Sequence, residues 1–204
     1  MIPLLRILCL GDSYTIGESV AGTERWPVQL VAQLRARGID VPDPVIIAKT
    51  GWTTGDLNAA IDETQPQGPF ELVTLLIGVN NQYRGLSPGE YRAEFRALLS
   101  RAIGFAGGRA NHVIVLSIPD WGVTPFAASR DRLRIGRDID AYNSVNQEET
   151  ARLGAAYVDI TPISREAANA PSLTAPDGLH PSGEMYRLWA EIVYPETESV
   201  LKQG

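Results

Sequence analysis

Five short apolar runs divide the chain, and longer segments of mixed polarity separate them. The runs cover residues 4–10, 45–48, 72–77, 113–118 and 155–160. Few polar residues interrupt them, which is typical of strands that are buried on both faces of a parallel sheet. We therefore predict five buried strands at these positions.

Apolar residues in the intervening segments recur every three or four positions, which is the spacing of one face of a helix. They form five groups: Trp26, Leu30, Val31 and Leu34; Leu57, Ala60, Ile61 and Thr64; Tyr91, Phe95, Leu98, Leu99 and Ala102; Ile135, Ile139, Tyr142 and Val145; Met185, Leu188, Trp189 and Ile192. We predict one helix at each group.

Capping residues locate several helix ends. The stretch Ser87-Pro88-Gly89-Glu90 has the order of a capping box with proline at the first helical position, so Ser87 is predicted to be a helix cap. Asp56 is predicted to cap the helix that follows the second strand. Pro181 is predicted to open the last helix.

Strands that alternate with helices imply βαβ units with right-handed crossovers. We therefore predict the α/β class, with a five-stranded parallel sheet covered by helices on both faces. Residues 79–86 and 161–179 are polar and 119–129 lacks periodicity, so all three are predicted to be loops. A chain of 204 residues without repeats or linkers is expected to form one domain over residues 1–204.

The overall charge limits the partners that the protein can have. Its formal net charge is −6, whereas nucleic acids and anionic membranes bind basic surfaces. Residues 1–10 are apolar but lack the basic start and cleavage site of a signal peptide, and no run reaches the ~20 apolar residues of a membrane helix. We therefore expect a cytoplasmic protein without integral membrane association. The sequence does not indicate an oligomeric state.

The residues that follow the strands carry the candidate chemistry. The carboxyl ends of parallel strands meet at one edge of a sheet, where ligands of such folds bind. Ser13 follows the first strand directly after Gly11-Asp12, and it offers a hydroxyl nucleophile. Gly51 and Asn80 follow the second and third strands, and they offer a backbone N–H and a side-chain amide to a developing oxyanion.

A base and an orienting carboxylate come from the last loop. His180 can accept the serine proton, and Asp177, three residues earlier, can orient its imidazole. The second histidine, His112, opens the fourth strand at the opposite end of the sheet, ~17–20 Å away, where we expect it to be solvated. Asp120 and Asp159 are alternative carboxylates near the same edge.

Other motifs are weaker. The stretch 85–89 reads G-x-S-x-G, but the serine is followed by Pro88, which lacks the N–H that a nucleophile elbow uses. Two distant histidines and the single cysteine, Cys9, which is predicted to be a small core residue, do not form a metal site. No P-loop or G-x-G-x-x-G motif occurs. We expect no metal and no cofactor.

Four stretches together resemble the SGNH (GDSL-type) hydrolase family. They are Gly11-Asp12-Ser13, Gly51, Gly78-Val79-Asn80 and Asp177-Gly178-Leu179-His180, in the order of the family. The resemblance implies a three-layer α/β/α fold and a serine esterase or lipase-like activity. It implies Ser13 as nucleophile, Asp177 and His180 as its triad partners, and an oxyanion hole formed by the N–H groups of Ser13 and Gly51 and the Asn80 amide.

The first and third stretches depart from the family pattern. The first reads GDSY instead of GDSL, outside the reacting atoms. The third reads GVNN, with Asn81 where the family usually has aspartate, which changes the hydrogen bonds available beside Asn80.

The sequence is less informative about the substrate. Candidate substrate-binding residues near the edge are Trp52, Asn81, Tyr83, Trp121 and Phe126. The arginines 130, 132, 134 and 137 could favour an anionic substrate, or form the solvated face of a helix balanced by the aspartates 131, 138 and 140. A small acyl ester or a lysophospholipid is the expected small-molecule partner, and an O-acetylated carbohydrate is the alternative. A non-catalytic binding module and a mononucleotide binder of flavodoxin type share the architecture.

Overall fold

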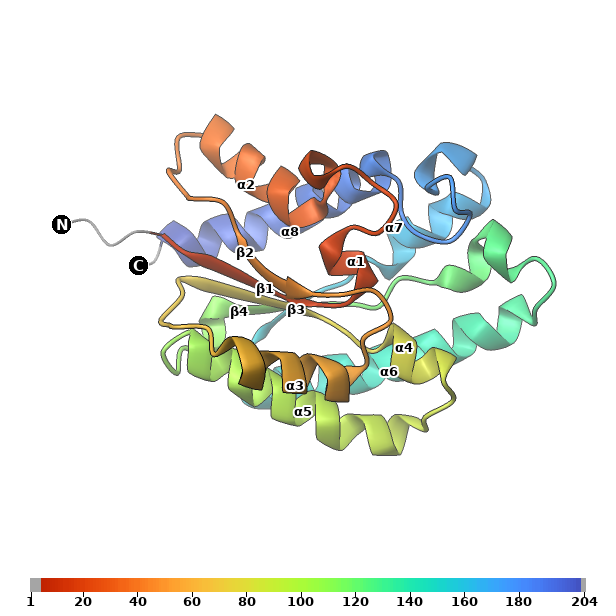
Figure 1. Cartoon of the computed structure of the whole chain (residues 1–204), viewed down its shortest axis with the longest axis horizontal. Helices are drawn as coiled ribbons and strands as arrows, with labels where there is room; N and C mark the ends of the chain where they lie inside the picture. Colours follow the sequence, from red (N-terminus) through yellow and green to blue (C-terminus); the bar gives the residue numbers. More distant parts are fainter. Residues whose placement is uncertain (1–4, 203–204) are drawn as a thin grey trace.

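A computed structural model describes residues 5–202, and it has a parallel five-stranded sheet between two layers of helices (Figure 1). The strands are β1 (Ile7–Gly11), β2 (Val45–Ala48), β3 (Leu72–Leu76), β4 (Val113–Leu116) and β5 (Ala156–Val158), in the spatial order β2-β1-β3-β4-β5. The predicted fold class is confirmed. Leu4, the start of the first predicted strand, lies outside the described residues.

Helices cover both faces of the sheet. They are α1 (Ser13–Ile16), α2 (Trp26–Ala36), α3 (Thr54–Thr64), α4 (Val79–Tyr83), α5 (Pro88–Phe105), α6 (Arg132–Leu153), α7 (Thr161–Arg165) and α8 (Gly183–Lys202). Figure 1 shows α2 and α8 on one face, and α3, α5 and α6 on the other. All strands point toward the side of the molecule where α1 and α4 begin (Figure 1).

The central strands fix the position of the predicted nucleophile. β1 and β3 are buried along their whole length, and their register pairs Gly11 with Leu76 at the carboxyl edge. A Cβ atom on Gly11 would lie 2.6 Å from the carbonyl oxygen of Leu76, so only glycine allows this approach. Ser13 therefore begins α1 directly beside the end of β3.

Two predicted loops contain helices. Residues 79–86 include α4, and residues 161–179 include α7 and two short 3₁₀ turns. These helices are too short to show apolar periodicity, because one turn places only one or two residues on the buried side. Surrounding contacts hold them in place: Asn80, for example, donates a hydrogen bond to a carbonyl of the β2–α3 loop.

Several helix ends also differ from prediction. Thr53, not Asp56, caps α3, and Asp56 is the third residue of a capping box that accepts from Thr53. The last helix begins at Gly183 rather than at Pro181, and it continues past Pro195 to Lys202. Ile192, assigned to its apolar face, is 38% exposed. Ser87 caps α5 as predicted.

Within residues 5–202, no helix is long and apolar enough to cross a membrane.

Candidate active site

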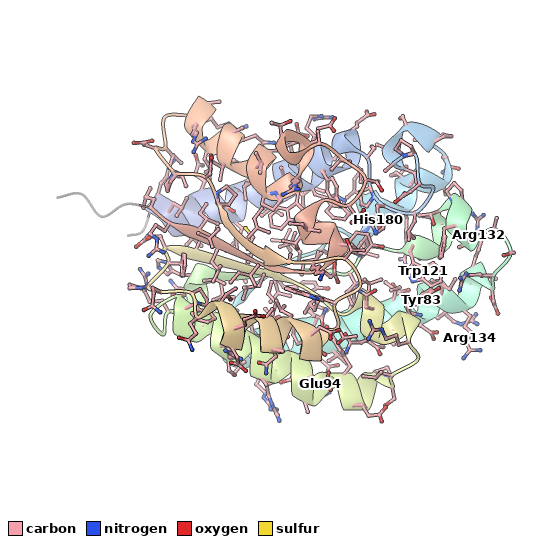
Figure 2. All side chains as sticks on the ribbon, in the orientation of Figure 1. Tyr83, Glu94, Trp121, Arg132, Arg134 and His180 are labelled. Carbon is pink, nitrogen blue, oxygen red and sulfur yellow. The ribbon has the colours of Figure 1, made fainter. Side chains whose placement is uncertain are left out.

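The loops at the carboxyl edge of the sheet enclose a cavity of about 230 Å³. Four residues with predicted catalytic or oxyanion roles line it: Ser13, Gly51, Asn80 and His180. Three of the predicted substrate-binding aromatics also line it: Tyr83, Trp121 and Phe126. Tyr83 and Trp121 pack edge to face with ring centroids 5.5 Å apart, near His180 (Figure 2).

Ser13 is held at the first turn of α1. Asp12 caps this helix, and its Oδ1 accepts a hydrogen bond from the Tyr14 N–H at 3.0 Å. The Ser13 carbonyl accepts from Gly17, which closes the turn within four residues. Ser13 is 5% exposed, and its own N–H donates to no atom of residues 5–202. A buried helix start with a free N–H is a favourable position for a negative charge.

His180 and Asp177 form a close pair. The Nδ1 of His180 lies 2.6 Å from Oδ2 of Asp177, and the two residues are three positions apart in the chain. An ionised carboxylate only accepts hydrogen bonds, so the imidazole donates from Nδ1. Its Nε2 is then the nitrogen that remains available as a base.

Asp177 accepts four hydrogen bonds. Oδ2 accepts from His180 and from the hydroxyl of Ser19 at 2.6 Å, and Oδ1 accepts from the N–H groups of Leu179 and His180 at 2.9 and 3.0 Å. Partial burial of the carboxylate opposes its ionisation. The hydrogen bonds outweigh this effect and hold the pKa of Asp177 well below its usual range. Asp177 is therefore ionised at any working pH.

Ser19 was missed by the sequence analysis. It has a left-handed backbone with φ of 65° and lies 158 positions before the carboxylate that it contacts. Serine at a turn is common, and no local pattern connects this one to the last loop. The tertiary fold alone brings Ser19 to Asp177.

Ser13 and His180 face the same cavity but are not hydrogen-bonded to each other. Such contacts are often long before a substrate is bound, and they shorten in the reacting complex. The rings of Tyr14 and His180 pack in a T-shaped arrangement, with centroids 5.8 Å apart.

Two further donors face this space. Gly51 has φ of 85°, which favours glycine, and its N–H has no acceptor in the described part of the chain. The amide of Asn80 donates one hydrogen bond to the carbonyl of Trp52 at 2.9 Å, which leaves its second N–H free. Together with Ser13, these groups supply three N–H donors beside one cavity.

Comparisons with known proteins identify the family of the chain. Residues 9–188 match the model of the GDSL-like Lipase/Acylhydrolase family. The chain belongs to this family. Membership places the GDSL-like protein among the carboxylic-ester hydrolases. No curated protein shows significant sequence similarity to it.

Solved structures share the fold of this GDSL-like protein at low identity. TesA has a TM-score of 0.72 and 19% identity, over 96% of this chain and 99% of that one. A member of the lipolytic G-D-S-L family from Veillonella parvula has a TM-score of 0.73 and 19% identity, over 93% of this chain and 96% of that one. Axe2, an acetylxylan esterase from Geobacillus stearothermophilus, has a TM-score of 0.72 and 20% identity, over 94% of this chain and 93% of that one.

Two predicted substrate-binding residues do not line the cavity of the GDSL-like protein. Trp52 packs against the hydrophobic core instead. Asn81 is fully buried: its Oδ1 accepts from the Thr54 N–H at 3.1 Å, and its Nδ2 donates to Thr54 Oγ1 and Glu94 Oε2 at 2.6 and 3.3 Å. Asn81 instead joins α4 to α3 and to Glu94 on α5; Figure 2 labels Glu94.

The alternative acid and base residues are engaged elsewhere. His112 is buried, not solvated as predicted, and its Nδ1 lies 2.7 Å from the carbonyl oxygen of Glu71. Asp120 pairs with Arg165, and Asp159 accepts from Ser117. Among the described residues, neither carboxylate forms a hydrogen bond or ion pair with His180. Burial raises the pKa of the Cys9 thiol to about 12, so this cysteine is a core residue.

No group of three or more histidine, cysteine or acidic side chains that could hold a metal ion occurs in residues 5–202.

Asp12, the residue directly before Ser13, has a buried carboxyl group. It is 1% exposed, and its Oδ2 has no hydrogen-bond partner among the described residues. Burial raises the pKa of Asp12 to about 7, although the Tyr14 N–H favours the ionised form. The unfolded chain therefore releases this proton at lower pH than the folded protein, and stability falls as pH rises from about 4 to about 7.

We expect Asp12→Asn to remove this loss, because asparagine can still accept from Tyr14. At pH 8 the melting temperature of the variant should exceed that of the wild type by at least about 3 °C, which corresponds to a gain of about 1 kcal/mol in the free energy of unfolding. The gain should disappear near pH 4. Thermal unfolding at both pH values measures it, with Asp43→Asn, at a side chain 85% exposed, as control. A gain that is independent of pH would contradict the assignment.

The Asn81 contacts generate a second prediction. Asn81→Asp should place a second carboxylate beside Glu94 and displace α4, because aspartate cannot donate to Oε2. We expect kcat for an aryl ester at pH 8 to fall about tenfold, within the ~10²-fold scale of a small misplacement. KM should change little. The double variant Asn81→Asp/Glu94→Gln should recover most of kcat, because glutamine can donate to the new carboxylate. Equal kcat in the single and double variants would contradict this account.

Proposed function

We propose that this protein hydrolyses carboxylic esters through an acyl-enzyme on Ser13. One observation carries the proposal. His180, whose Nδ1 is paired with Asp177, and Ser13 line one cavity, together with Gly51 and Asn80, and the N–H groups of Ser13 and Gly51 have no acceptor among the described residues. Nucleophile, base, orienting carboxylate and oxyanion donors are the components of acyl transfer.

In the first half-reaction, Ser13 Oγ attacks the ester carbonyl carbon, and His180 Nε2 takes the hydroxyl proton. The carbonyl oxygen becomes an oxyanion and accepts hydrogen bonds from the N–H groups of Ser13 and Gly51 and from Asn80. Asp177, held ionised by its four hydrogen bonds, stabilises the imidazolium. The intermediate then collapses, the C–O bond to the alcohol breaks, and the alcohol takes the proton from His180.

In the second half-reaction, water replaces the alcohol. His180 takes a proton from water as its oxygen attacks the acyl carbon, and the same donors stabilise the second oxyanion. Collapse breaks the bond to Ser13 Oγ, which recovers its proton from His180. The products are a carboxylic acid and the free enzyme.

The size of the cavity favours small acyl groups. Its volume of about 230 Å³ is below the ~300–1,000 Å³ of typical ligand pockets, so a long lysophospholipid chain would extend beyond it. Short-chain acyl esters are therefore the proposed substrates. An O-acetylated carbohydrate is the second candidate, because Tyr83 and Phe126 at the cavity are 49% and 40% exposed and could pack against a sugar ring.

The decisive test compares the wild type with Ser13→Ala on 4-nitrophenyl esters from acetate to dodecanoate and on acetylated xylo-oligosaccharide. We expect turnover of the short esters by the wild type, loss of at least ~10³-fold in Ser13→Ala, and labelling of Ser13 by a fluorophosphonate. Acetyl-sugar turnover above that of the aryl acetate would favour the second candidate. Equal rates in both proteins would refute an acyl-serine mechanism, and no turnover of any ester would favour a binding module.

Asn80→Ala tests the oxyanion role separately. Loss of one donor should lower kcat by ~10²–10³-fold with a smaller change in KM, because the hydrogen bond strengthens in the transition state. The same side chain ties α4 to Trp52, so the melting temperature must be measured alongside. A loss below about threefold in a folded variant would remove Asn80 from the oxyanion hole.

A further inference from the structure

A positively charged side chain lies against the aromatic wall of the cavity. The guanidinium carbon of Arg130 lies over the rings of Tyr83, Trp121 and Phe126, at 5.2, 5.4 and 4.8 Å from their centroids. One of its N–H groups donates to the Tyr83 hydroxyl at 3.1 Å. Arg130 therefore contacts three of the residues that line the cavity, from the segment between β4 and α6.

Arg130 contacts the aromatic wall of the cavity and has no anionic partner within residues 5–202, whereas other arginines around this edge are engaged by carboxylates or backbone carbonyls. Arg84 lies 3.8 Å from Asp56, and Arg165 pairs with Asp120 and Asp140. Arg132 donates to the backbone carbonyls of residues 123 and 124. Within residues 5–202, no carboxylate forms an ion pair with Arg130. Its neighbour Asp131 is used to cap α6, where it accepts from the N–H of Arg134.

The rings give this cation a defined position without neutralising it. Contact with an aromatic face orients a guanidinium, and the side chain loses less entropy when an anion then binds. Only one of the five guanidinium N–H groups of Arg130 donates a hydrogen bond within the described residues, to the Tyr83 hydroxyl. The remaining donors have the planar geometry that pairs with a carboxylate through two hydrogen bonds.

We propose that Arg130 makes the enzyme selective for esters that carry a carboxylate remote from the scissile bond. This proposal rests on the ester hydrolysis proposed above and defines its substrate class. The carboxylate belongs either to the acyl chain or to the alcohol of the ester. In either position it would pair with Arg130 beside Tyr83, Trp121 and Phe126. Arg130 is exposed, so the effect is moderate and depends on salt.

The alternative is that Arg130 only packs the aromatic wall. In that case its replacement would alter neutral and anionic esters equally. Arg137 provides a matched control: it is an exposed arginine of the neighbouring helix α6, has no ion-pair partner among the described residues, and does not line the cavity. Its replacement changes the net charge by the same amount as replacement of Arg130.

The experiment uses two matched substrate pairs. For the acyl side, they are mono-4-nitrophenyl adipate and 4-nitrophenyl hexanoate. For the alcohol side, they are 4-acetoxybenzoate and its methyl ester. The values of kcat/KM are measured for the wild type, Arg130→Gln, Arg130→Lys and Arg137→Gln, in low salt and in 0.5 M NaCl, a concentration that shortens the ~10 Å screening length of 0.1 M salt.

In one of the two pairs, we expect the wild type to prefer the anionic ester. Arg130→Gln should lower kcat/KM for that ester about fivefold and for its neutral partner less than twofold, the scale of a partly exposed ion pair. Arg130→Lys should keep part of the preference, and salt should weaken it. The pair that responds identifies whether the acyl chain or the alcohol carries the carboxylate.

Three results would overturn the proposal: no anionic preference in either pair, an equal loss for anionic and neutral esters in Arg130→Gln, or the same loss in Arg137→Gln. Each of them is compatible with ester hydrolysis by Ser13. A wild type that cleaves none of the four esters would instead remove the proposed function, and with it this inference.

Discussion

The position of the candidate base depends on one carboxylate, that of Asp177. Its two oxygens accept from the imidazole of His180, from Ser19 and from two backbone N–H groups of its own loop. The backbone bonds hold the short segment from Asp177 to His180 in a tight turn. Ser19 ties that turn to the loop that follows the predicted nucleophile. Chain segments 158 positions apart thus meet at a single carboxylate, which also accepts from the imidazole of His180.

The other side of the cavity depends on an uncharged network. Asn80 and Asn81 are adjacent on α4, but their side chains do different things: Asn80 reaches the carbonyl of Trp52, and Asn81 is buried against Thr54 and Glu94. The two contacts fasten α4 to the start of α3, and Gly51 lies just before that start. The spacing between the Gly51 N–H and the Asn80 amide is therefore set by hydrogen bonds behind the cavity wall. An amide at position 81 both accepts and donates, which suits a site that contains a backbone N–H and a carboxylate.

Much of this arrangement could be predicted from the sequence. Apolar runs located the strands because parallel strands are buried on both faces, and the residues after them share one edge by geometry alone. Short-range hydrogen bonds such as those from His180 to Asp177 follow from sequence proximity. Contacts made only in the tertiary fold could not be predicted: Ser19, the burial of Asn81 and the packing of Arg130 on three rings have no local pattern. The helix α4 was predicted as a loop because five residues cannot show a period.

The fold shifts the pKa values of two aspartates near the cavity, Asp12 and Asp177, in opposite directions. Asp177 is partly exposed but accepts four hydrogen bonds, and the pKa of its carboxyl is lowered. Asp12 is buried with one hydrogen bond, and its pKa is raised to about 7. Hydrogen bonds to the charged form lower the pKa of Asp177, whereas desolvation raises that of Asp12. Only Asp177 is therefore suited to stabilise an imidazolium across the pH range. Asp12 sits one residue before Ser13, and an ionised carboxylate there would repel the developing oxyanion. Asp12 keeps its proton below its pKa of about 7 and avoids that repulsion there, and the protein loses stability as the pH rises toward that value.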